Sequence, residues 1–204
     1  MFLSRGNLLA DGMRNRNGQG EYTVLFADLR DSTAMSELLS ADEMVALLNA
    51  FLGALTRPII AHGGVVDKFL GDGVMAVFGA SASDASRGAI SAVRAVLAMR
   101  RTVKALNDER VEHDEVPVRF GVGICTGEVI IARIGLPERS DVTAIGVTVN
   151  TAARLSGLCK TFGVDVVLAA ETRAQLNGAE FAIRDLGAAT VQGRSDPVAV
   201  STLV

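Results

Sequence analysis

Two aspartates of this chain stand where apolar sequence breaks off. Asp28 lies near the end of the apolar segment 22–29, and Asp72 lies between two glycines inside the apolar segment 67–79. An Asp-Gly pair between apolar runs is typical of a β-hairpin turn, which alone would explain Asp72. If the two segments are neighbouring strands, however, both carboxylates lie at one end of a sheet. Such oxygen ligands favour Mg²⁺ or Mn²⁺ beside substrate phosphates.

A second pair of polar residues lies in the segment "VNTAARL". Asn150 and Arg154 are four residues apart, so a helix places them on the same face. The fixed fork of donors on an arginine suits the charge that develops on a phosphorane, and the asparagine could orient a sugar. An ordinary polar helix face is the alternative interpretation.

The elements that must position these residues follow from hydrophobic periodicity. Residues 22–29 predict a buried strand, and a capping box from Ser40 to Glu43 begins a helix that Pro58 kinks or ends before the glycines at 63 and 64. Further along, we expect a strand, turn and strand in 67–79, a helix over 84–107, two strands in 116–135 joined near Thr126 to Glu128, a strand and helix in 142–158, and short strands in 164–169, 181–187 and 197–204. This alternation indicates an α/β domain.

Composition excludes several classes of function. The 204 residues include 20 Lys+Arg and 23 Asp+Glu, and this net charge of -3 argues against broad nucleic-acid binding. The two cysteines form no C-x-x-C motif, and two histidines supply histidine-based metal sites poorly. No apolar run approaches the ~20 residues of a membrane span. We expect a flexible linker over 1–20 and a soluble cytoplasmic domain over 21–204, with any sensor or membrane segment outside these residues.

The motifs "FADLRDST", "DKFLGDGVMAVFG" and "TAIGVTVNTAARL", in this order, resemble the catalytic domain of class III nucleotide cyclases. The resemblance runs from about residue 22 to the C-terminus. It implies a ferredoxin-like α/β (α+β) cyclase homology domain with a central, mostly antiparallel sheet flanked by helices. It also implies a reaction, in which the ribose 3′-hydroxyl of ATP attacks the α-phosphorus and yields cyclic AMP and pyrophosphate.

The same resemblance assigns roles to the polar residues. Asp28 and Asp72 match the metal-binding aspartates, and the Leu29 carbonyl matches a further ligand, for two Mg²⁺ or Mn²⁺ ions per site. Asn150 matches the residue that orients the ribose, and Arg154 the residue that stabilises the transition state. No dedicated general base is visible.

Two further positions bear on the choice of base. Lys68 stands where adenylate cyclases of the family carry a lysine, and an ammonium group, which only donates, fits adenine N1 but not the N1–H of guanine. Thr143 resembles the class IIIb adenylate cyclase subgroup, several members of which respond to bicarbonate. A salt bridge between Lys68 and Asp67 and the β-propensity of Thr143 are the alternative explanations.

In this family the site forms between two subunits. One chain supplies Asp28 and Asp72, and the other supplies Lys68, Thr143, Asn150 and Arg154. This chain holds both sets, so the resemblance implies a head-to-tail homodimer with two shared sites. The stretch 131–141 is the expected dimerisation arm.

The sequence departs from the family pattern at the phosphate contacts. Asp31 and Ser32 replace a common Gly-Phe, although Ser32 and Thr33 could still offer backbone N–H groups to phosphate. Gln192 stands where many members have a phosphate-binding lysine, and Arg194 could compensate for it. Gly121 stands where some members have a phosphate-contacting arginine. Gln192 favours one alternative function, a non-catalytic cyclase-like module that binds nucleotide or bicarbonate. The other alternative is a guanylate cyclase, against which Lys68 argues.

Overall fold

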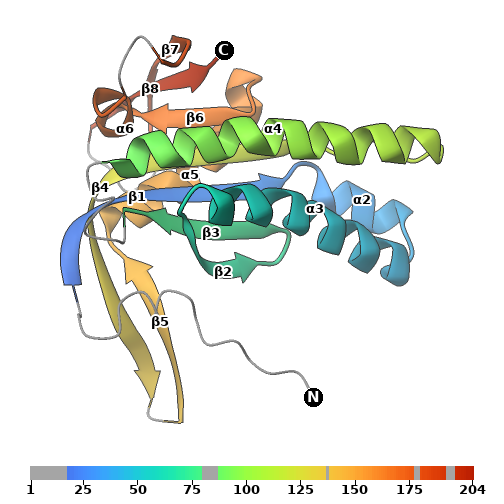
Figure 1. Ribbon diagram of the computed structural model, residues 1–204, viewed down its shortest axis with the longest axis horizontal. Helices are drawn as coiled ribbons and strands as arrows, with labels where there is room; N and C mark the ends of the chain where they lie inside the picture. The colour runs from blue at the N-terminus through green and yellow to red at the C-terminus, as the bar shows by residue number, and fades with distance from the viewer. Residues whose placement is uncertain (1–17, 80–86, 137, 177–179, 192–195) are drawn as a thin grey trace.

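One mixed sheet runs through the computed structural model, which describes residues 18–79, 87–136, 138–176, 180–191 and 196–204 (Figure 1). The strand order is β2-β3-β1-β4-β6-β8-β7, and β5 pairs with β4 outside this path. Among the described pairings only β4 with β6 is parallel. The strands are β1 (Gly18–Leu29), β2 (Val65–Leu70), β3 (Gly73–Phe78), β4 (Phe120–Leu136), β5 (Arg139–Ile145), β6 (Val166–Ala169), β7 (Ile183–Ala189) and β8 (Val198–Leu203).

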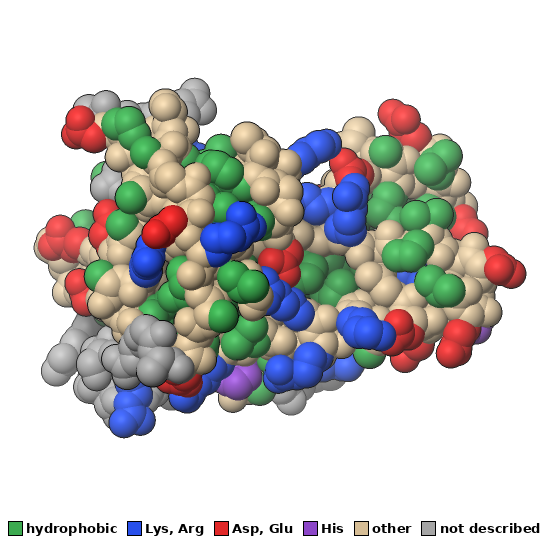
Figure 2. Space-filling model, turned by 90° about the horizontal axis from the view of Figure 1, so that it is seen from above, with side chains coloured by type: hydrophobic (Ala, Val, Ile, Leu, Met, Phe, Trp, Pro, Cys, Tyr) green, Lys and Arg blue, Asp and Glu red, His purple; other side chains and the backbone are tan. Residues whose placement is uncertain are grey.

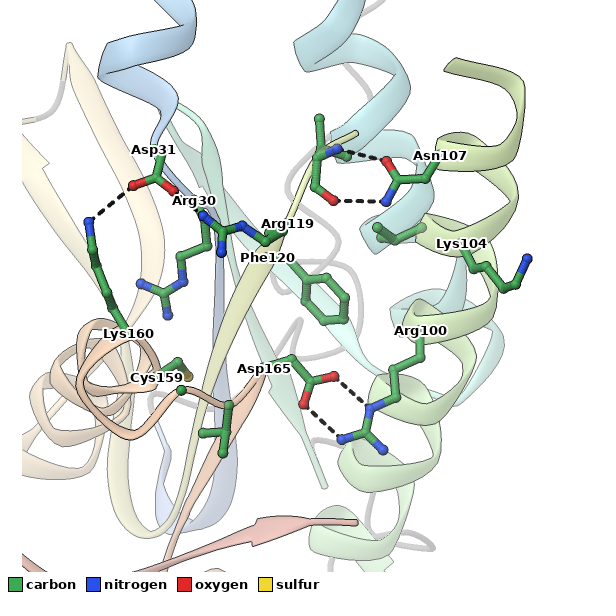
Figure 3. Close-up of a pocket in the computed structure, with 14 residues that line it drawn as sticks. Arg30, Asp31, Arg100, Lys104, Asn107, Arg119, Phe120, Cys159, Lys160 and Asp165 are labelled. Atoms are coloured by element: carbon green, nitrogen blue, oxygen red, sulfur yellow. Dashed lines mark hydrogen bonds and ion pairs between the residues drawn. The ribbon is translucent and has the colours of Figure 1, made fainter. Parts of the chain in front are cut away.

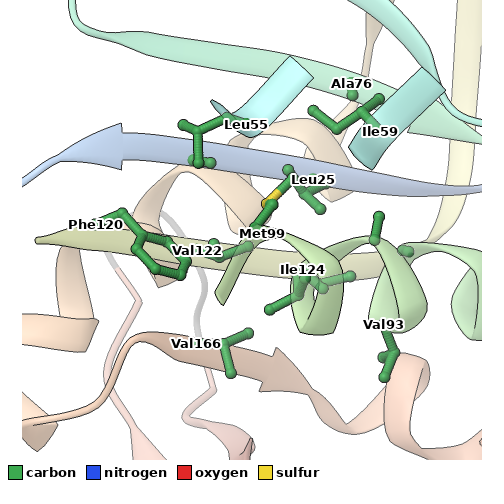
Figure 4. Close-up of a cluster of buried hydrophobic side chains, with 14 of the residues drawn as sticks. Leu25, Leu55, Ile59, Ala76, Val93, Met99, Phe120, Val122, Ile124 and Val166 are labelled. Carbon is green, nitrogen blue, oxygen red and sulfur yellow. The ribbon is translucent and has the colours of Figure 1, made fainter. Parts of the chain in front are cut away.

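Helices cover both faces of this sheet. They are α2 (Ser32–Leu38), α3 (Ala41–Ala61), α4 (Gly88–Glu112), α5 (Val147–Phe162) and α6 (Ala170–Ala174). The long helices α3 and α4 pack on one face over a core of aliphatic and aromatic side chains (Figure 4). The helix α5 packs on the other face over a second core. A mostly antiparallel sheet between helices confirms the predicted fold class.

The alternation of side chains along β1 decides which way Asp28 faces. Leu25 and Ala27 belong to the core under α3 and α4, whereas Val24 belongs to the core under α5. Successive side chains of a strand point to opposite faces, so Asp28 shares the face of Val24. The carboxylate therefore lies on the side of the sheet that α5 covers.

The proline in α3 neither ends nor interrupts the helix, which contradicts part of the expectation. The capping box at Ser40 is present as predicted, and the helix continues past Pro58 to Ala61. A proline leaves the carbonyl four residues earlier without its helical partner. Here the Thr102 hydroxyl of α4 donates to that carbonyl, on Ala54, at 2.7 Å. By length and composition α3 could also cross a membrane, although one side of it packs in the core.

The segment predicted as two strands is one continuous strand, β4. The residues Thr126, Gly127 and Glu128 resemble a turn, but Gly127 has no positive φ and all three pair with β1. Thr126 is buried and shares a 2.9 Å hydrogen bond with Thr23 of β1. The glycine instead makes room for the Thr148 side chain of α5. The second half of β4 forms a hairpin with β5 that projects from the body and contains the described part of the stretch 131–141, for which dimerisation stays a prediction (Figure 1).

Two element boundaries differ from their predicted positions. The helix α4 extends to Glu112 rather than ending near residue 107, and β1 begins at Gly18, inside the predicted linker. At the start of β1, Gly18 to Gly20 pair with β4 residues Ile131 to Val129. Cross-strand hydrogen bonds thus extend the strand beyond its apolar sequence.

The helix α5 lies directly against β4 at Gly123. A Cβ atom on this residue would collide with backbone atoms of Ala152, Leu155 and Ser156. Backbone atoms cannot move aside as a flexible side chain can. The position of α5 on the sheet therefore depends on a glycine at this point of β4.

Substituting Gly123→Ala is expected to lower the free energy of unfolding by about 2–3 kcal/mol, because the added methyl overpacks a backbone contact. Gly157→Ala is the matched control, because Gly157 lies in α5, the helix that contacts Gly123, and has no atom within 4 Å of the added methyl. That control should raise stability by about 0.5–1 kcal/mol. Urea unfolding of both variants measures these changes, and equal stability of the two variants contradicts the contact.

Candidate active site

The two predicted metal-binding aspartates lie together at one end of the sheet. Asp28 is paired with Gly73 across the β1–β3 ladder, so it is next to the turn that carries Asp72. The Leu29 N–H donates to the Asp72 carbonyl at 3.3 Å, which fixes that turn to the end of β1. The Asp-Gly turn is thus both a hairpin turn, as its sequence indicated, and the neighbour of a second carboxylate.

The surroundings of Asp28 make its negative charge costly in the absence of a cation. Burial raises the pKa of the Asp28 carboxyl, and the nearby Asp72 carboxylate adds to that increase. A hydrogen bond involving Ser156 and the positive charge of Arg30 oppose it. The Arg30 Nη1 atom is 3.8 Å from Asp28 Oδ1, and the Asp28 side chain keeps 34% of its surface exposed. Asp28 is accessible to a ligand and would gain from a further positive charge.

Arg30, which was not predicted from the sequence, occupies the space next to Gly121. Its guanidinium group donates to the Ser156 carbonyl of α5, and a Cβ atom at Gly121 would collide with it. The space at Gly121, where the resemblance places an arginine in some members of the family, is therefore filled by an arginine from the turn that follows β1. The missing side chain at Gly121 was the sequence signal that could have pointed to Arg30.

The extra carboxylate of Asp31 is neutralised by two basic residues. It accepts hydrogen bonds from Arg119 at 2.7 Å and from Lys160 at 3.1 Å (Figure 3). These two contacts lower the pKa of the Asp31 carboxyl, that to Lys160 more strongly. The residue has a φ of 57°, the left-handed conformation that glycine adopts most easily. Asp31 thus follows the backbone course of a glycine and ties the start of α2 to α5.

The two predicted base-recognition residues are in direct contact. The Lys68 ammonium group on β2 donates to the Thr143 hydroxyl on β5 at 2.7 Å. The Thr143 hydroxyl donates to Asp67 Oδ2 at 2.8 Å, and that oxygen also accepts the Ala144 N–H at 3.3 Å. From the sequence, Asp67 was expected only as an alternative salt-bridge partner of Lys68. The distance from Lys68 Nζ to Asp67 Oδ2 is 3.9 Å, so Thr143 is closer to each of these two residues than they are to each other.

The remaining predicted residues are not gathered with these groups. Asn150 and Arg154 lie on α5, where Asn150 is exposed and Arg154 is half-buried. Within the described ranges, no hydrogen bond or ion pair joins either side chain to Asp28 or Lys68. Ser32 and Thr33 form the first turn of α2, next to Asp31. Gln192 and Arg194 lie outside the described residues.

A cavity of about 540 Å³ lies beside the Asp31 contacts, between α4, the start of β4 and the end of α5 (Figure 3). Arg100 forms a bidentate ion pair with Asp165 on its wall, and the Asn107 side chain binds the Val118 backbone. Figure 2 shows Lys and Arg side chains around a hollow in the face seen from above. Neither Asp28 nor Asp72 lines this cavity, but Arg30, which pairs with Asp28, does.

The carboxylate pair fits a metal ion that other ligands complete. Among the residues that the structure describes, no group of three or more His, Cys, Asp or Glu side chains gathers as in a closed metal site. Mg²⁺ binds through one or two carboxylates plus substrate phosphates and waters. Two adjacent carboxylates on an accessible sheet end are the donor set that such an ion needs from the protein.

Comparison with known proteins gives the same family. The model of the family described as "Adenylate and Guanylate cyclase catalytic domain" matches residues 15–202. "Adenylate cyclase, terminal-differentiation specific" of Dictyostelium discoideum is 34% identical over 184 residues, which cover 89% of this chain and 8% of that protein. "Adenylate cyclase 1" of Rhizobium meliloti is also 34% identical, over 90% of this chain and 27% of that protein. The chain thus spans less than a third of either relative.

A solved structure has a similar backbone. The adenylyl cyclase CyaB from P. aeruginosa superimposes with a TM-score of 0.85 at 31% sequence identity, over 93% of this chain and 96% of that chain. The family match covers nearly the whole sequence and the fold agrees with it. This chain therefore belongs to the class III nucleotide cyclase catalytic domain family.

Proposed function

We propose that this domain is an adenylate cyclase, a phosphorus–oxygen lyase that converts ATP to 3′,5′-cyclic AMP and pyrophosphate at sites shared by two copies of the chain. The observation that carries the proposal is the convergence of Asp28 and Asp72 at one sheet end. The contact between Lys68 and Thr143 supports adenine as the base. Family membership supports the cyclisation reaction.

Asp28, Asp72 and the Leu29 carbonyl are the proposed ligands of two Mg²⁺ or Mn²⁺ ions. When bound, the ions would acidify the ribose 3′-hydroxyl and neutralise the β- and γ-phosphates. Arg30 partly offsets the charge of Asp28 before metal binds, at 3.8 Å. The backbone N–H groups of Ser32 and Thr33 are the proposed phosphate contacts, together with Arg194.

Four residues of the partner chain would position the nucleotide. Lys68 donates to adenine N1 and Thr143 contacts the 6-amino group. Asn150 orients the ribose, and the guanidinium of Arg154 stabilises charge on the α-phosphate. Positioning and electrostatics then account for most of the rate, because no side chain of the set is placed as a general base.

Exposed apolar side chains support the proposed homodimer. The β4–β5 arm, the end of β2 and the start of α5 leave large hydrophobic residues at the surface of the single chain. They are Phe69, Leu70, Ile134, Leu136, Ile145 and Val147, each at least 40% exposed. A second copy that covers these side chains would also bring its own Asn150 and Arg154 to the carboxylate pair, consistent with two-fold closure of homo-oligomers.

Regulation and location are proposed on less direct grounds than the reaction. Because of Thr143, we propose that the domain belongs to the class IIIb subgroup and responds to bicarbonate. Adding bicarbonate to the activity assay tests this. The chain covers less than a third of the length of either relative. Regulatory domains, location and other partners are therefore properties of the whole protein. We propose a cytoplasmic location for the domain, where ATP is available.

Turnover of ATP with Mn²⁺ is the direct test of the activity. We expect cyclic AMP from the wild type, little cyclic GMP from GTP, and no product from Asp28→Ala or Asp72→Ala, because both carboxylates hold the metal. Wild-type turnover of GTP in preference to ATP would indicate a guanylate cyclase. Absence of any turnover would favour a non-catalytic module. Circular dichroism checks that each variant remains folded.

Metal binding can be tested without activity by Asp28→Asn. Because the pKa of Asp28 is raised on folding, the ionised carboxylate lowers the free energy of unfolding. This cost is absent at low pH, below the unfolded-state pKa, and is complete once pH exceeds the folded-state pKa. At pH 7 without metal, the variant should therefore melt at the same temperature as the wild type or higher. Saturating Mn²⁺ should stabilise only the wild type, by about 2.7 kcal/mol at a concentration 100 times the Kd.

Asp108→Asn is the control for this measurement, because Asp108 is an exposed carboxylate of α4 paired with Lys104. It should keep the full Mn²⁺ effect. Equal stabilisation of Asp28→Asn and the wild type by Mn²⁺ would remove Asp28 from the metal site.

The shared site predicts complementation between two inactive variants. Asp28→Ala lacks the metal half and Arg154→Ala lacks the transition-state half, so each homodimer is inactive. In an equal mixture, about half of the dimers are mixed and each has one intact site, so about one quarter of wild-type activity should return. A mixture that stays inactive, with subunit exchange confirmed by tagged pull-down, shows that each site lies within one chain.

A further inference from the structure

A β-bulge in β2 places two neighbouring residues on the same side of the strand. The ladder with β3 pairs Val66 with Ala76 and then Lys68 with Met75, so Asp67 is the additional residue. Neighbouring side chains of a regular strand point to opposite faces, and a bulge redirects one of them. As a result the side chains of Asp67 and Lys68 both reach Thr143 on β5.

This arrangement fixes the direction of the Thr143 hydroxyl. A hydroxyl has one hydrogen, and Asp67 Oδ2 takes it at 2.8 Å. The Ala144 carbonyl is a poorer acceptor at 3.4 Å, because a charged acceptor at shorter range binds more strongly. Asp67 Oδ2 also receives the Ala144 N–H, which confirms that this oxygen acts as an acceptor. One lone pair of the hydroxyl accepts from Lys68 at 2.7 Å, and the other remains.

Lys68 and Thr143 therefore present one donor and one acceptor to a ligand. Lys68, with 38% of its side chain exposed, has N–H groups beyond the one directed at Thr143, whereas the Asp67 side chain is fully buried. The Watson–Crick edge of adenine offers an acceptor at N1 and an amino donor at position 6. Guanine reverses both, with N1–H as a donor and O6 as an acceptor. The fixed hydroxyl direction makes the contact with O6 unfavourable, and the Lys68 ammonium, which only donates, makes the contact with N1–H unfavourable.

Asp67 brings no evident gain in stability. Its side chain has no exposed surface, and within the described part of the chain its Oδ1 atom has no hydrogen-bond partner. A buried carboxylate oxygen without a partner is costly. Burial raises the pKa of the Asp67 carboxyl, and the contacts with Thr143 and Lys68 only oppose this. The costly carboxylate is explained if its contact with Thr143 serves substrate recognition.

We propose that Asp67 is a positioning residue for base specificity, which selects adenine by holding the Thr143 hydroxyl as a hydrogen-bond acceptor. This inference rests on the proposed function. Without Asp67 the hydroxyl can rotate and donate to a 6-oxo group. Loss of Asp67 then weakens discrimination between purines rather than catalysis itself.

The test compares ATP with inosine triphosphate, which has the 6-oxo group and N1–H of guanine but no 2-amino group to clash. The quantity measured is the ratio of kcat/KM for ATP to that for inosine triphosphate, with Mn²⁺. We expect Asp67→Ala to lower this ratio about tenfold or more, the range of one hydrogen-bond mismatch. Most of the change should appear in KM.

Matched variants separate this effect from loss of charge or of fold. Asp108→Ala removes an exposed carboxylate of α4, outside the β4–β5 arm, and should leave the ratio unchanged. Asp67→Asn keeps an acceptor for the Thr143 hydroxyl and should retain most of the discrimination. Thr143→Val should lower the ratio as Asp67→Ala does, and combining the two should have no additional effect, because both act through one hydroxyl.

A wild-type ratio in Asp67→Ala overturns the proposal, and so does full additivity of Asp67→Ala with Thr143→Val. If Asp67→Ala fails to fold, a wild-type ratio in Thr143→Val overturns it instead. If the wild type turns over neither nucleotide, the proposed activity fails separately. The ratio of ATP and inosine triphosphate dissociation constants, measured by calorimetry on the same variants, then decides the role of Asp67.

Discussion

The antiparallel pairing of β1 with β3 sets Asp28 opposite Gly73 and thereby holds Asp28 and Asp72 at one sheet end. A slip of one residue would turn Asp28 to the face that α3 and α4 cover, away from the ion site. The side chains of β1 pack into a core on each face of the sheet, and a slip would exchange their faces and mispack both cores. Core packing thus fixes the register, and the register fixes the carboxylate pair.

The second half of the site depends on a different contact. The helix α5 carries Asn150 and Arg154 and rests on β4 at Gly123, while the hairpin of β4 and β5 carries Thr143 toward Lys68. These groups make no hydrogen bond or ion pair with the carboxylate pair in the described part of one chain. This separation is accounted for if a second copy covers the exposed apolar side chains of the arm and completes each site.

Sequence patterns predicted the features that depend on local chemistry. The Asp-Gly turn, the capping box at Ser40 and the α/β architecture are present as expected. The errors arose where tertiary contacts override local preference. Thr126 to Glu128 resemble a turn but lie within β4, because Thr126 bonds to a neighbouring strand. Pro58 is tolerated in α3 because Thr102 on another helix binds the carbonyl that it frees. The positions of Arg30 and Asp67 depend on contacts across the fold that one sequence does not display.

The account as a whole requires that one chain holds the metal ions and the other holds the base. A crystal structure with an unreactive ATP analogue and Mn²⁺ tests this directly through the anomalous signal of manganese. The predicted result is manganese between Asp28 and Asp72 of one protomer, with the adenine against Lys68 and Thr143 of its partner. Manganese bound elsewhere, or a nucleotide held wholly within one chain, would contradict it.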